Sequence, residues 1–236
     1  LELQWLRRDV DRDALASYFR YGNVPTPATI YEGICKLEPG CFLKVHTREG
    51  VVEKRKYWEL GIQVQERSEA ESLKILNAEL DETFRMYVRS DVAFGCFLSG
   101  GVDSSLVTAL TARHADPQVQ TFTIGFQERH VSELPFAAKV SDIVGTEHTE
   151  KIVSPQLALD LLSRMARHFG EPFADSSAVP TFYVSHETSR RVKMVLSGDG
   201  GDELFAGYAS HARTYRDHRD MFGGLKRVLF GTLATW

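Results

Sequence analysis

Residues 92–113 constrain the fold more than any other stretch, because they join a buried strand to a helix through a turn of glycine and serine. Residues 92–98 are almost all apolar, which is typical of a strand buried in a parallel sheet. The turn SGGVDSS follows at residues 99–105, and residues 106–113 have the composition of a helix that packs on a sheet. A strand, a glycine-rich turn and a helix N-terminus in this order predict an α/β fold with a binding site for an anion such as phosphate.

The side chains of this turn indicate how an anion would be held. Gly100 and Gly101 let the backbone approach a ligand closely, and the first N–H groups of the helix carry partial positive charge. Three hydroxyl groups are further donors, those of Ser99, Ser104 and Ser105. The common phosphate loop has a lysine that reaches the phosphates, whereas this turn has Asp103. We therefore expect Asp103 to hold a divalent cation that also binds phosphate oxygens. The alternative is a Ser/Gly-rich turn in which Asp103 only starts the helix.

A second turn rich in glycine and carboxylates follows another short apolar stretch. Residues 193–196 predict a buried strand, and the sequence SGDGGDELFAGY follows at residues 197–208. Because the carboxyl ends of parallel strands lie at one edge of a sheet, Asp103 and Asp202 would face one another if the two strands are neighbours. Two carboxylates with phosphate oxygens then suit Mg²⁺. The alternative is a surface loop rich in Asp and Gly, which would not explain why this composition recurs at two strand ends.

Strands and helices alternate along the chain, which predicts a doubly wound parallel sheet. The remaining expected strands are residues 119–126 and 148–153, and the expected helices are residues 68–90, 134–144, 156–168 and 181–191. Ser68 and Glu71 form a capping box for the first of these helices. Its expected apolar stripe consists of Leu73, Leu76, Leu80, Phe84 and Tyr87 or Val88. A helix at 11–21 and a hairpin at 41–45 and 51–58 precede it, with too few apolar positions to stand alone.

Two further features concern residues outside the glycine turns. Asp175, Ser176 and Ser177 lie in a loop at 170–180, where they either cap the following helix or line a substrate pocket. The eight histidines show no metal-ligand spacing, and we expect His148 to lie near the carboxyl edge of the sheet.

Composition narrows the classes of partner. The 236 residues suit one α/β domain with an appendage or two small domains, and a net charge of −4 without a basic block disfavours nucleic acid. No apolar run reaches membrane-spanning length and no signal peptide is present, so we expect no membrane partner. Cys35, Cys41 and Cys96 form no CxxC pair, which favours a reducing, cytoplasmic compartment with Cys96 as a core residue.

With both glycine turns in view, the chain resembles the synthetase half of glutamine-dependent asparagine synthetases. The similar stretches are residues 24–40, 97–105 (FLSGGVDSS), 121–126 (TFTIGF), 145–148 (GTEH), 171–177 (EPFADSS) and 195–205 (VLSGDGGDELF). They occur in the expected order and span nearly the whole chain. The resemblance implies a fold of the adenine nucleotide alpha hydrolase-like type, also called the PP-loop ATP pyrophosphatase fold, with a small N-terminal helix-plus-hairpin segment. It also implies an inter-domain segment at 1–60, which follows a glutaminase domain, and an ATP-binding domain at 61–236 that is truncated at its C-terminal end.

The resemblance further implies a two-step amidation that uses ATP and Mg²⁺. The side-chain carboxylate of aspartate, or of a related acid, is adenylylated with release of pyrophosphate, and ammonia derived from glutamine then attacks. Residues 99–105 would hold the pyrophosphate, and Asp103 and Asp202 would hold the metal. The family's adenosine site corresponds here to the backbone of Leu98, Ile124 and Gly198, and Ser197 is a further expected cofactor-binding residue. Asp199 would accept a proton from the attacking ammonia.

Several departures from the family pattern keep other functions open. Gly170 stands where Asp is common, and Val-Ser-Glu at 131–133 replaces Tyr-Asp-Glu, so the acceptor could instead be a carboxylate of a cell-surface sugar or a natural product. Neither the glutaminase domain nor a downstream lysine near the phosphates is in the sequence, which allows a nucleotide-binding module that is catalytically incomplete. A tRNA-thiolating activity is disfavoured by the absence of a basic surface and of a cysteine pair. The resemblance also allows a homodimer.

Overall fold

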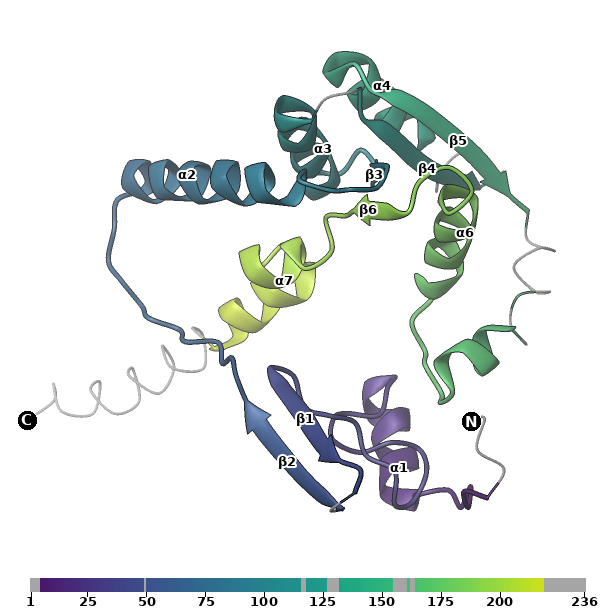
Figure 1. The fold of residues 1–236 in the computed structure, drawn as a ribbon. Helices are drawn as coiled ribbons and strands as arrows, with labels where there is room; N and C mark the ends of the chain where they lie inside the picture. Colours follow the sequence, from purple (N-terminus) through teal and green to yellow (C-terminus); the bar gives the residue numbers. More distant parts are fainter. Residues whose placement is uncertain are drawn as a thin grey trace, which may run out of the picture. The chain divides into compact units, whose positions relative to one another are not determined.

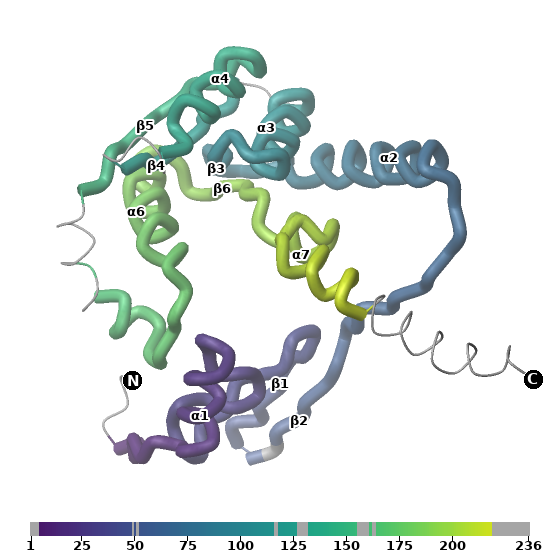
Figure 2. The backbone as a smooth tube through the Cα atoms, turned by 180° about the vertical axis from the view of Figure 1, so that it is seen from behind, coloured from purple at the N-terminus to yellow at the C-terminus, as the bar shows by residue number. Residues whose placement is uncertain are grey.

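The computed structural model describes residues 5–48, 50–115, 118–126, 132–154, 161 and 164–218. The described residues form two compact units (Figures 1 and 2). Unit 1 takes its residues from Leu1–Leu76 and Val153–Tyr183, and unit 2 takes its residues from Asn77–Ile152 and Val184–Trp236. Each unit therefore combines segments that are far apart in the sequence. None of the described helices has the length and apolarity that a membrane crossing requires.

Unit 1 begins with the short helix α1 (Arg12–Tyr21), as predicted for residues 11–21. Asp11 caps it, because its side chain accepts hydrogen bonds from the N–H groups of Asp13 and Ala14 at 2.9 and 3.0 Å. The helix ends at Gly22, which has a φ of 76° and so adopts the left-handed conformation that glycine allows. A small core of Ala14, Val24 and Ile30 forms beneath it, flanked by partly buried neighbours such as Leu15 and Tyr18.

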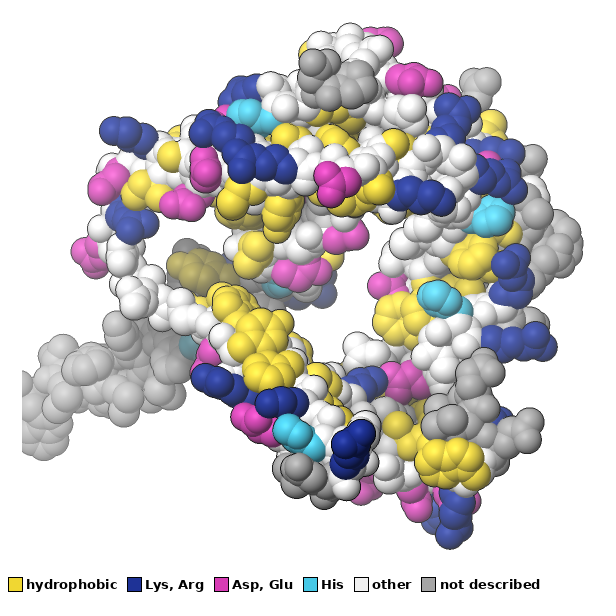
Figure 3. Space-filling model, in the orientation of Figure 1, with side chains coloured by type: hydrophobic (Ala, Val, Ile, Leu, Met, Phe, Trp, Pro, Cys, Tyr) yellow, Lys and Arg dark blue, Asp and Glu magenta, His cyan; other side chains and the backbone are white. Residues whose placement is uncertain are grey.

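The predicted hairpin is confirmed as β1 (Cys41–His46) and β2 (Val51–Lys56), which pair antiparallel. Hydrophobic side chains remain exposed along it and just beyond it (Figure 3), namely Leu43, Val45, Val52, Tyr57 and Trp58. A two-stranded hairpin buries little apolar surface by itself. The segment therefore depends on other parts of unit 1 for its stability.

Residues from the second half of the chain hold the N-terminal segment in place. The N–H of Ala174 donates to the carbonyl of Gly22 at 2.8 Å, and the N–H of Ile30 donates to Glu171 Oε2 at 3.2 Å. Glu171 Oε1 also forms an ion pair with Lys36, and both side chains are partly buried. These contacts tie the segment at 22–36, which has few apolar positions, to the loop at 171–174.

Unit 2 is built on a four-stranded sheet with the order β5-β4-β3-β6. The strands are β3 (Phe94–Phe97), β4 (Gln120–Phe126), β5 (Glu147–Val153, of which only Val153 belongs to unit 1) and β6 (Met194–Leu196). β3 is parallel to both of its neighbours, β4 and β6. The chain runs outward from β3 through β4 to β5 and then returns to the other side of β3. This reversal of strand order is the feature of a doubly wound α/β sheet, so the predicted fold class is confirmed.

Helices follow the strands as the sequence pattern predicts. α3 (Val102–His114) follows β3 and α4 (Leu134–Val144) follows β4, and the two pack on those strands and on each other. The short helix α7 (Gly201–Phe205) follows β6. The core of the sheet includes Cys96, which is fully buried as expected, and burial raises the pKa of its thiol.

Two predictions about helices and one prediction about a histidine need correction. α2 (Glu69–Tyr87) is capped by Ser68, but Leu73 of its expected buried stripe is more than half exposed. Of the two alternatives for the end of the stripe, Tyr87 is exposed and Val88 is half-buried. α6 (Ala178–Thr188) begins three residues before the predicted position. His148 is the second residue of β5, so it lies at the amino edge of the sheet and not at the carboxyl edge. Most of the helix predicted at 156–168 lies outside the described residues.

Candidate functional site

The turn between β3 and α3 presents an uncapped helix N-terminus. Gly101 is the N-cap residue of α3, and no side chain in the described part of the chain accepts a hydrogen bond from the first turn there. The N–H of Ser105 donates to the carbonyl of Gly101 at 3.0 Å, which closes the first turn. The N–H groups at the start of α3 are therefore available to a ligand, and the helix dipole makes this position favourable for an anion.

Two of the predicted hydroxyl donors shape the turn. The hydroxyl groups of Ser99 and Ser104 are 2.9 Å apart and share a hydrogen bond. Ser104 Oγ also accepts from the N–H of Ser99 at 3.2 Å, and Ser99 Oγ accepts from the N–H of Gly101 at 3.2 Å. These bonds fold the turn over the end of the strand. The two serines therefore act first as an internal brace of the turn.

Gly100 is required by both conformation and space. Its φ is +83°, and a Cβ at this position would lie 2.6 Å from the carbonyl carbon of Phe136 and 2.7 Å from the amide nitrogen of Ala137. Both atoms belong to the first turn of α4. The turn after β3 is therefore packed directly against the start of α4, which limits its movement.

The second glycine turn, after β6, lies directly against the first. A Cβ on Gly198 would be 2.9 Å from Asp103 Cβ and from the amide nitrogen of Ser104. A Cβ on Gly201 would be 2.5 Å from the Asp103 carboxyl carbon. The two turns meet because β3 and β6 are neighbours, which is the condition on which the predicted site depends. This place, where the strand order reverses, is also where open α/β sheets bind ligands.

A pocket of about 710 Å³ opens between these two turns. Its volume falls in the range of about 300–1,000 Å³ that is usual for small-molecule sites. Eight of the predicted site residues line it, namely Ser99, Gly101, Asp103, Ser104, Ser197, Gly198, Asp199 and Asp202. The pocket therefore brings together most of the residues that the sequence pattern singled out.

The remaining predicted site residues lie outside the lining of this pocket, namely Leu98, Gly100, Ser105 and Ile124. Leu98 is buried, its N–H donates to the carbonyl of Phe122 at 3.0 Å, and its carbonyl accepts from Thr123 Oγ1. Ile124 is half-buried within β4. Their contribution to a nucleotide site stays a prediction.

Among the described residues, the pocket lining carries four carboxylates, those of Asp103, Glu133, Asp199 and Asp202, and no lysine or arginine. Glu133 was missed as a site residue by sequence reasoning. The available signal was its place at the start of α4, since helices that follow parallel strands begin at the same edge of the sheet. Ser197 Oγ donates to Asp199 Oδ2 at 2.9 Å and fixes one oxygen of that carboxylate. An anionic ligand would need cations to enter a pocket of this charge.

The donor set suits a metal ion that shares its ligands with a phosphate. Among the described residues, no three His, Cys, Asp or Glu side chains are grouped so as to hold a metal by themselves. Mg²⁺ is usually bound by one or two carboxylates, with phosphate oxygens and water completing its octahedron. Asp103 and Asp202 line one pocket beside the uncapped start of α3, so the residues present fit Mg²⁺ together with a nucleotide.

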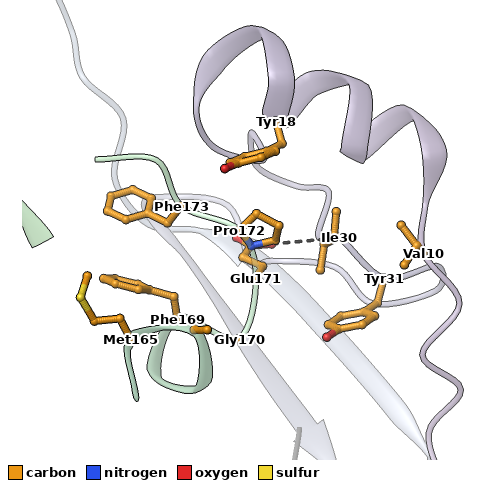
Figure 4. Close-up of a pocket in the computed structure, with 11 residues that line it drawn as sticks. Val10, Tyr18, Ile30, Tyr31, Met165, Phe169, Gly170, Glu171, Pro172 and Phe173 are labelled. Atoms are coloured by element: carbon orange, nitrogen blue, oxygen red, sulfur yellow. Dashed lines mark hydrogen bonds between the residues drawn. The ribbon is translucent and has the colours of Figure 1, made fainter. Parts of the chain in front are cut away.

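Unit 1 contains a separate pocket of about 500 Å³ (Figure 4). Aromatic rings dominate its walls, those of Tyr18, Tyr31, Phe169 and Phe173. Its carboxylate, Glu171, is already bound to Lys36 and to the N–H of Ile30. Near it, Asp175 Oδ1 accepts from the N–H of Ser177 at 2.8 Å just before α6, which supports the local helix-start role expected for this loop.

Comparisons with known proteins show the family to which this chain is related. The asparagine synthase family model matches residues 76–229. Glutamine-hydrolyzing asparagine synthetase 1 of Bacillus subtilis is 30% identical over 228 residues, which cover 96% of this chain and 36% of that protein. The glutamine-hydrolyzing asparagine synthetase of Triphysaria versicolor is 33% identical over 146 residues, covering 57% of this chain and 25% of that protein. The chain thus spans about a third or less of the length of these relatives.

Solved structures with a similar arrangement have lower sequence identity. The NH3-dependent NAD synthetase of Campylobacter jejuni has a TM-score of 0.41 and 19% identity, covering 58% of this chain and 60% of that one. The glutamine-dependent NAD+ synthetase of Acinetobacter baumannii, in complex with ADP, has a TM-score of 0.42 and 18% identity, covering 71% of this chain and 31% of that one.

Proposed function

Because the chain belongs to the asparagine synthase family, we propose that it is the ATP-activating part of a ligase that forms an amide from a carboxylic acid and ammonia. The observation that carries this proposal is the direct contact of two glycine turns around one pocket at the carboxyl ends of β3 and β6. In the complete protein, we propose, residues 1–60 follow a glutaminase domain that supplies ammonia, and residues 61–236 form most of the ATP-binding domain.

The start of α3 is the proposed site of the pyrophosphate that leaves ATP. Its uncapped N–H groups and the helix dipole favour negative charge, and the brace of Ser99 and Ser104 keeps those groups aligned. Preorganised donors of this kind stabilise charge as it develops on a leaving group. The proposed adenosine contacts are Leu98, Ile124 and Gly198, of which Gly198 lines the pocket.

Asp103 and Asp202 are the proposed ligands of Mg²⁺. When bound, the metal neutralises the pyrophosphate and so makes it a better leaving group. The two residues reach the pocket from different turns, and Gly201 lets the second turn lie against the Asp103 carboxylate.

Asp199 is proposed to act on the second step. Its carboxylate is exposed in the same pocket, and the Ser197 hydroxyl holds one oxygen, so the other remains available to accept a proton. Ammonia that attacks the acyl-adenylate becomes positively charged and must lose a proton to give a neutral amide. A positioned carboxylate base contributes about 10²–10⁴-fold to such a step.

Exchange of labelled pyrophosphate into ATP, dependent on an added acid, tests the proposal. The assay would use the complete protein with a panel that includes aspartate, a sugar acid and a dicarboxylic acid without an amino group. Acid-dependent exchange, followed by amide formation with ammonia, supports the ligase and identifies the acceptor. ATP binding without exchange for any acid would instead favour a nucleotide-binding module.

A further inference from the structure

The turn at the end of α7 has an alanine in the left-handed conformation, where glycine is usual. Ala206 has a φ of 56° and a ψ of 40°, and it is the one non-glycine residue with positive φ in the described part of the chain. The N–H of Gly207 donates to the carbonyl of Asp202 at 2.9 Å. This hydrogen bond and the left-handed residue before it define a Schellman turn, which commonly ends helices.

The glycine of this turn, Gly207, is not at the position where the turn conformation requires a glycine. In a Schellman turn the left-handed residue is usually glycine, because a Cβ is unfavourable there. Here alanine occupies the left-handed position, and glycine follows it at a position whose φ is not in the positive range. The conformation of the turn therefore does not explain the glycine at position 207. A requirement for space does.

The space at Gly207 is filled by the Asp202 carboxylate. A Cβ on Gly207 would overlap Asp202 Oδ1, and it would lie 2.9 Å from the carboxyl carbon and 3.2 Å from the Cα of the same residue. The turn brings the two residues together through the hydrogen bond between their backbones. Both line the pocket between the two glycine turns. A side chain at position 207 would thus force the Asp202 carboxylate to rotate, while the surrounding backbone could stay almost unchanged.

We propose that Gly207 is a positioning residue, which sets the direction of the Asp202 carboxylate toward Mg²⁺ and the nucleotide by leaving room for it beside the backbone. This inference rests on the proposed function, which assigns Asp202 to the metal. Gly207 contributes no polar side chain itself and acts through Asp202. The strained conformation of Ala206 fits this role, because it places the Gly207 Cα beneath the carboxylate.

The affinity for ATP, measured by calorimetry with and without Mg²⁺, tests this role. Gly207→Ala should weaken Mg·ATP binding by about 10–100-fold, the usual effect of disturbing the residues that orient a metal ligand. Asp202→Asn should weaken it at least as much, and the double variant should show no loss beyond that of Asp202→Asn. Affinity for ATP without metal should not change in Gly207→Ala. The matched control is Gly61→Ala, because a Cβ at Gly61 would meet no atom within 4 Å and this residue has no positive φ.

The melting temperature provides a readout that does not depend on the metal. If Ala at position 207 collides only with the Asp202 side chain, whose carboxylate can rotate away, Gly207→Ala should leave the melting temperature almost unchanged in both the wild-type and the Asp202→Ala background. An equal decrease in both backgrounds would overturn the proposal, since the collision would then involve other atoms.

The outcomes also separate this inference from the proposed function. If Asp202→Asn weakens Mg·ATP binding but Gly207→Ala does not, the positioning role is wrong and the metal assignment stands. If neither substitution affects Mg·ATP binding, the metal assignment itself is wrong, and the positioning role fails with it. Additive losses in the double variant would show that Gly207 acts independently of Asp202, which would also overturn the inference.

Discussion

The close packing of Gly100 against α4 predicts a large loss of stability on substitution. A Cβ at this position would meet the carbonyl carbon of Phe136 and the amide nitrogen of Ala137 at 2.6 and 2.7 Å. These are backbone atoms of a helix, so they cannot rotate away as the end of a side chain could. Gly100→Ala should therefore strain its own backbone, which has a φ of +83°, and also push the start of α4 away from the turn.

Two costs add at this position. A residue with a Cβ in the left-handed region costs about 1–2 kcal/mol. Extra atoms in a well-packed contact cost about 1–3 kcal/mol more. The free energy of unfolding should fall by about 2–5 kcal/mol, compared with the roughly 5–15 kcal/mol that stabilises a typical domain. Gly145 is the matched control, because it has a φ of +79° and a Cβ there would meet no atom within 4 Å, so that only the first cost applies.

Urea unfolding followed by circular dichroism measures both variants under the same conditions. We expect Gly100→Ala to lose at least about 1 kcal/mol more than Gly145→Ala, the lower end of the packing cost. Equal losses would refute the packing of the turn against α4. No loss in either variant would refute the left-handed conformation of both glycines.

Four other substitutions test separate parts of the molecule. In the complete protein, Asp202→Asn should suppress pyrophosphate exchange, whereas Asp199→Asn should spare exchange and slow amide formation by about 10²–10⁴-fold. Equal loss of both steps in both variants would contradict the separate roles of the two carboxylates. Glu171→Gln removes the partly buried ion pair with Lys36 and should lower the free energy of unfolding by roughly 1–3 kcal/mol, which an unchanged urea midpoint would disprove. Burial lowers the pKa of His148 in spite of Glu150 and Asp142, so the unfolded state binds more protons below about pH 6.5 and stability falls as the pH drops through that range. His148→Gln should flatten this dependence in unfolding experiments between about pH 7.5 and 5.5, and an identical slope would contradict it.

The sequence predicted best where local signals are strong. The bounds of α4 agree with the predicted helix at 134–144, because Pro135 is tolerated in the first turn and Gly145 ends the helix in a left-handed conformation. α6 shows how the same reasoning fails. In the sequence Pro180 indicates the end of a loop, but it lies in the first turn of α6, where a missing N–H costs nothing. Both conformations are compatible with the local sequence, so the boundary depends on contacts elsewhere.

Long-range contacts account for what the sequence could not show. The candidate site forms only because β3 and β6 are neighbours in the sheet. This pairing joins residues about a hundred positions apart along the chain. The hydrogen bond between Glu171 and Ile30, which holds the N-terminal segment, spans 141 positions. Leu73 is exposed although its helical spacing predicts a place in a buried stripe. The local sequence does not show whether another element covers that face of the helix. Local motifs therefore indicated the candidate site residues, and the topology of the sheet brought most of them to one pocket.

In the proposed function, the turn around Asp103 binds a nucleotide through a metal ion. Calorimetric titration of Mg·ATP into the protein and into Asp103→Asn tests it most directly, with Asp91→Asn as the control because Asp91 is exposed and lies outside the pocket lining. We predict that Asp103→Asn weakens Mg·ATP binding by at least about tenfold with an unchanged melting temperature, and that Asp91→Asn does neither. Unchanged Mg·ATP affinity in Asp103→Asn would contradict the claim, and a large decrease in its melting temperature would show that Asp103 serves the start of α3 instead.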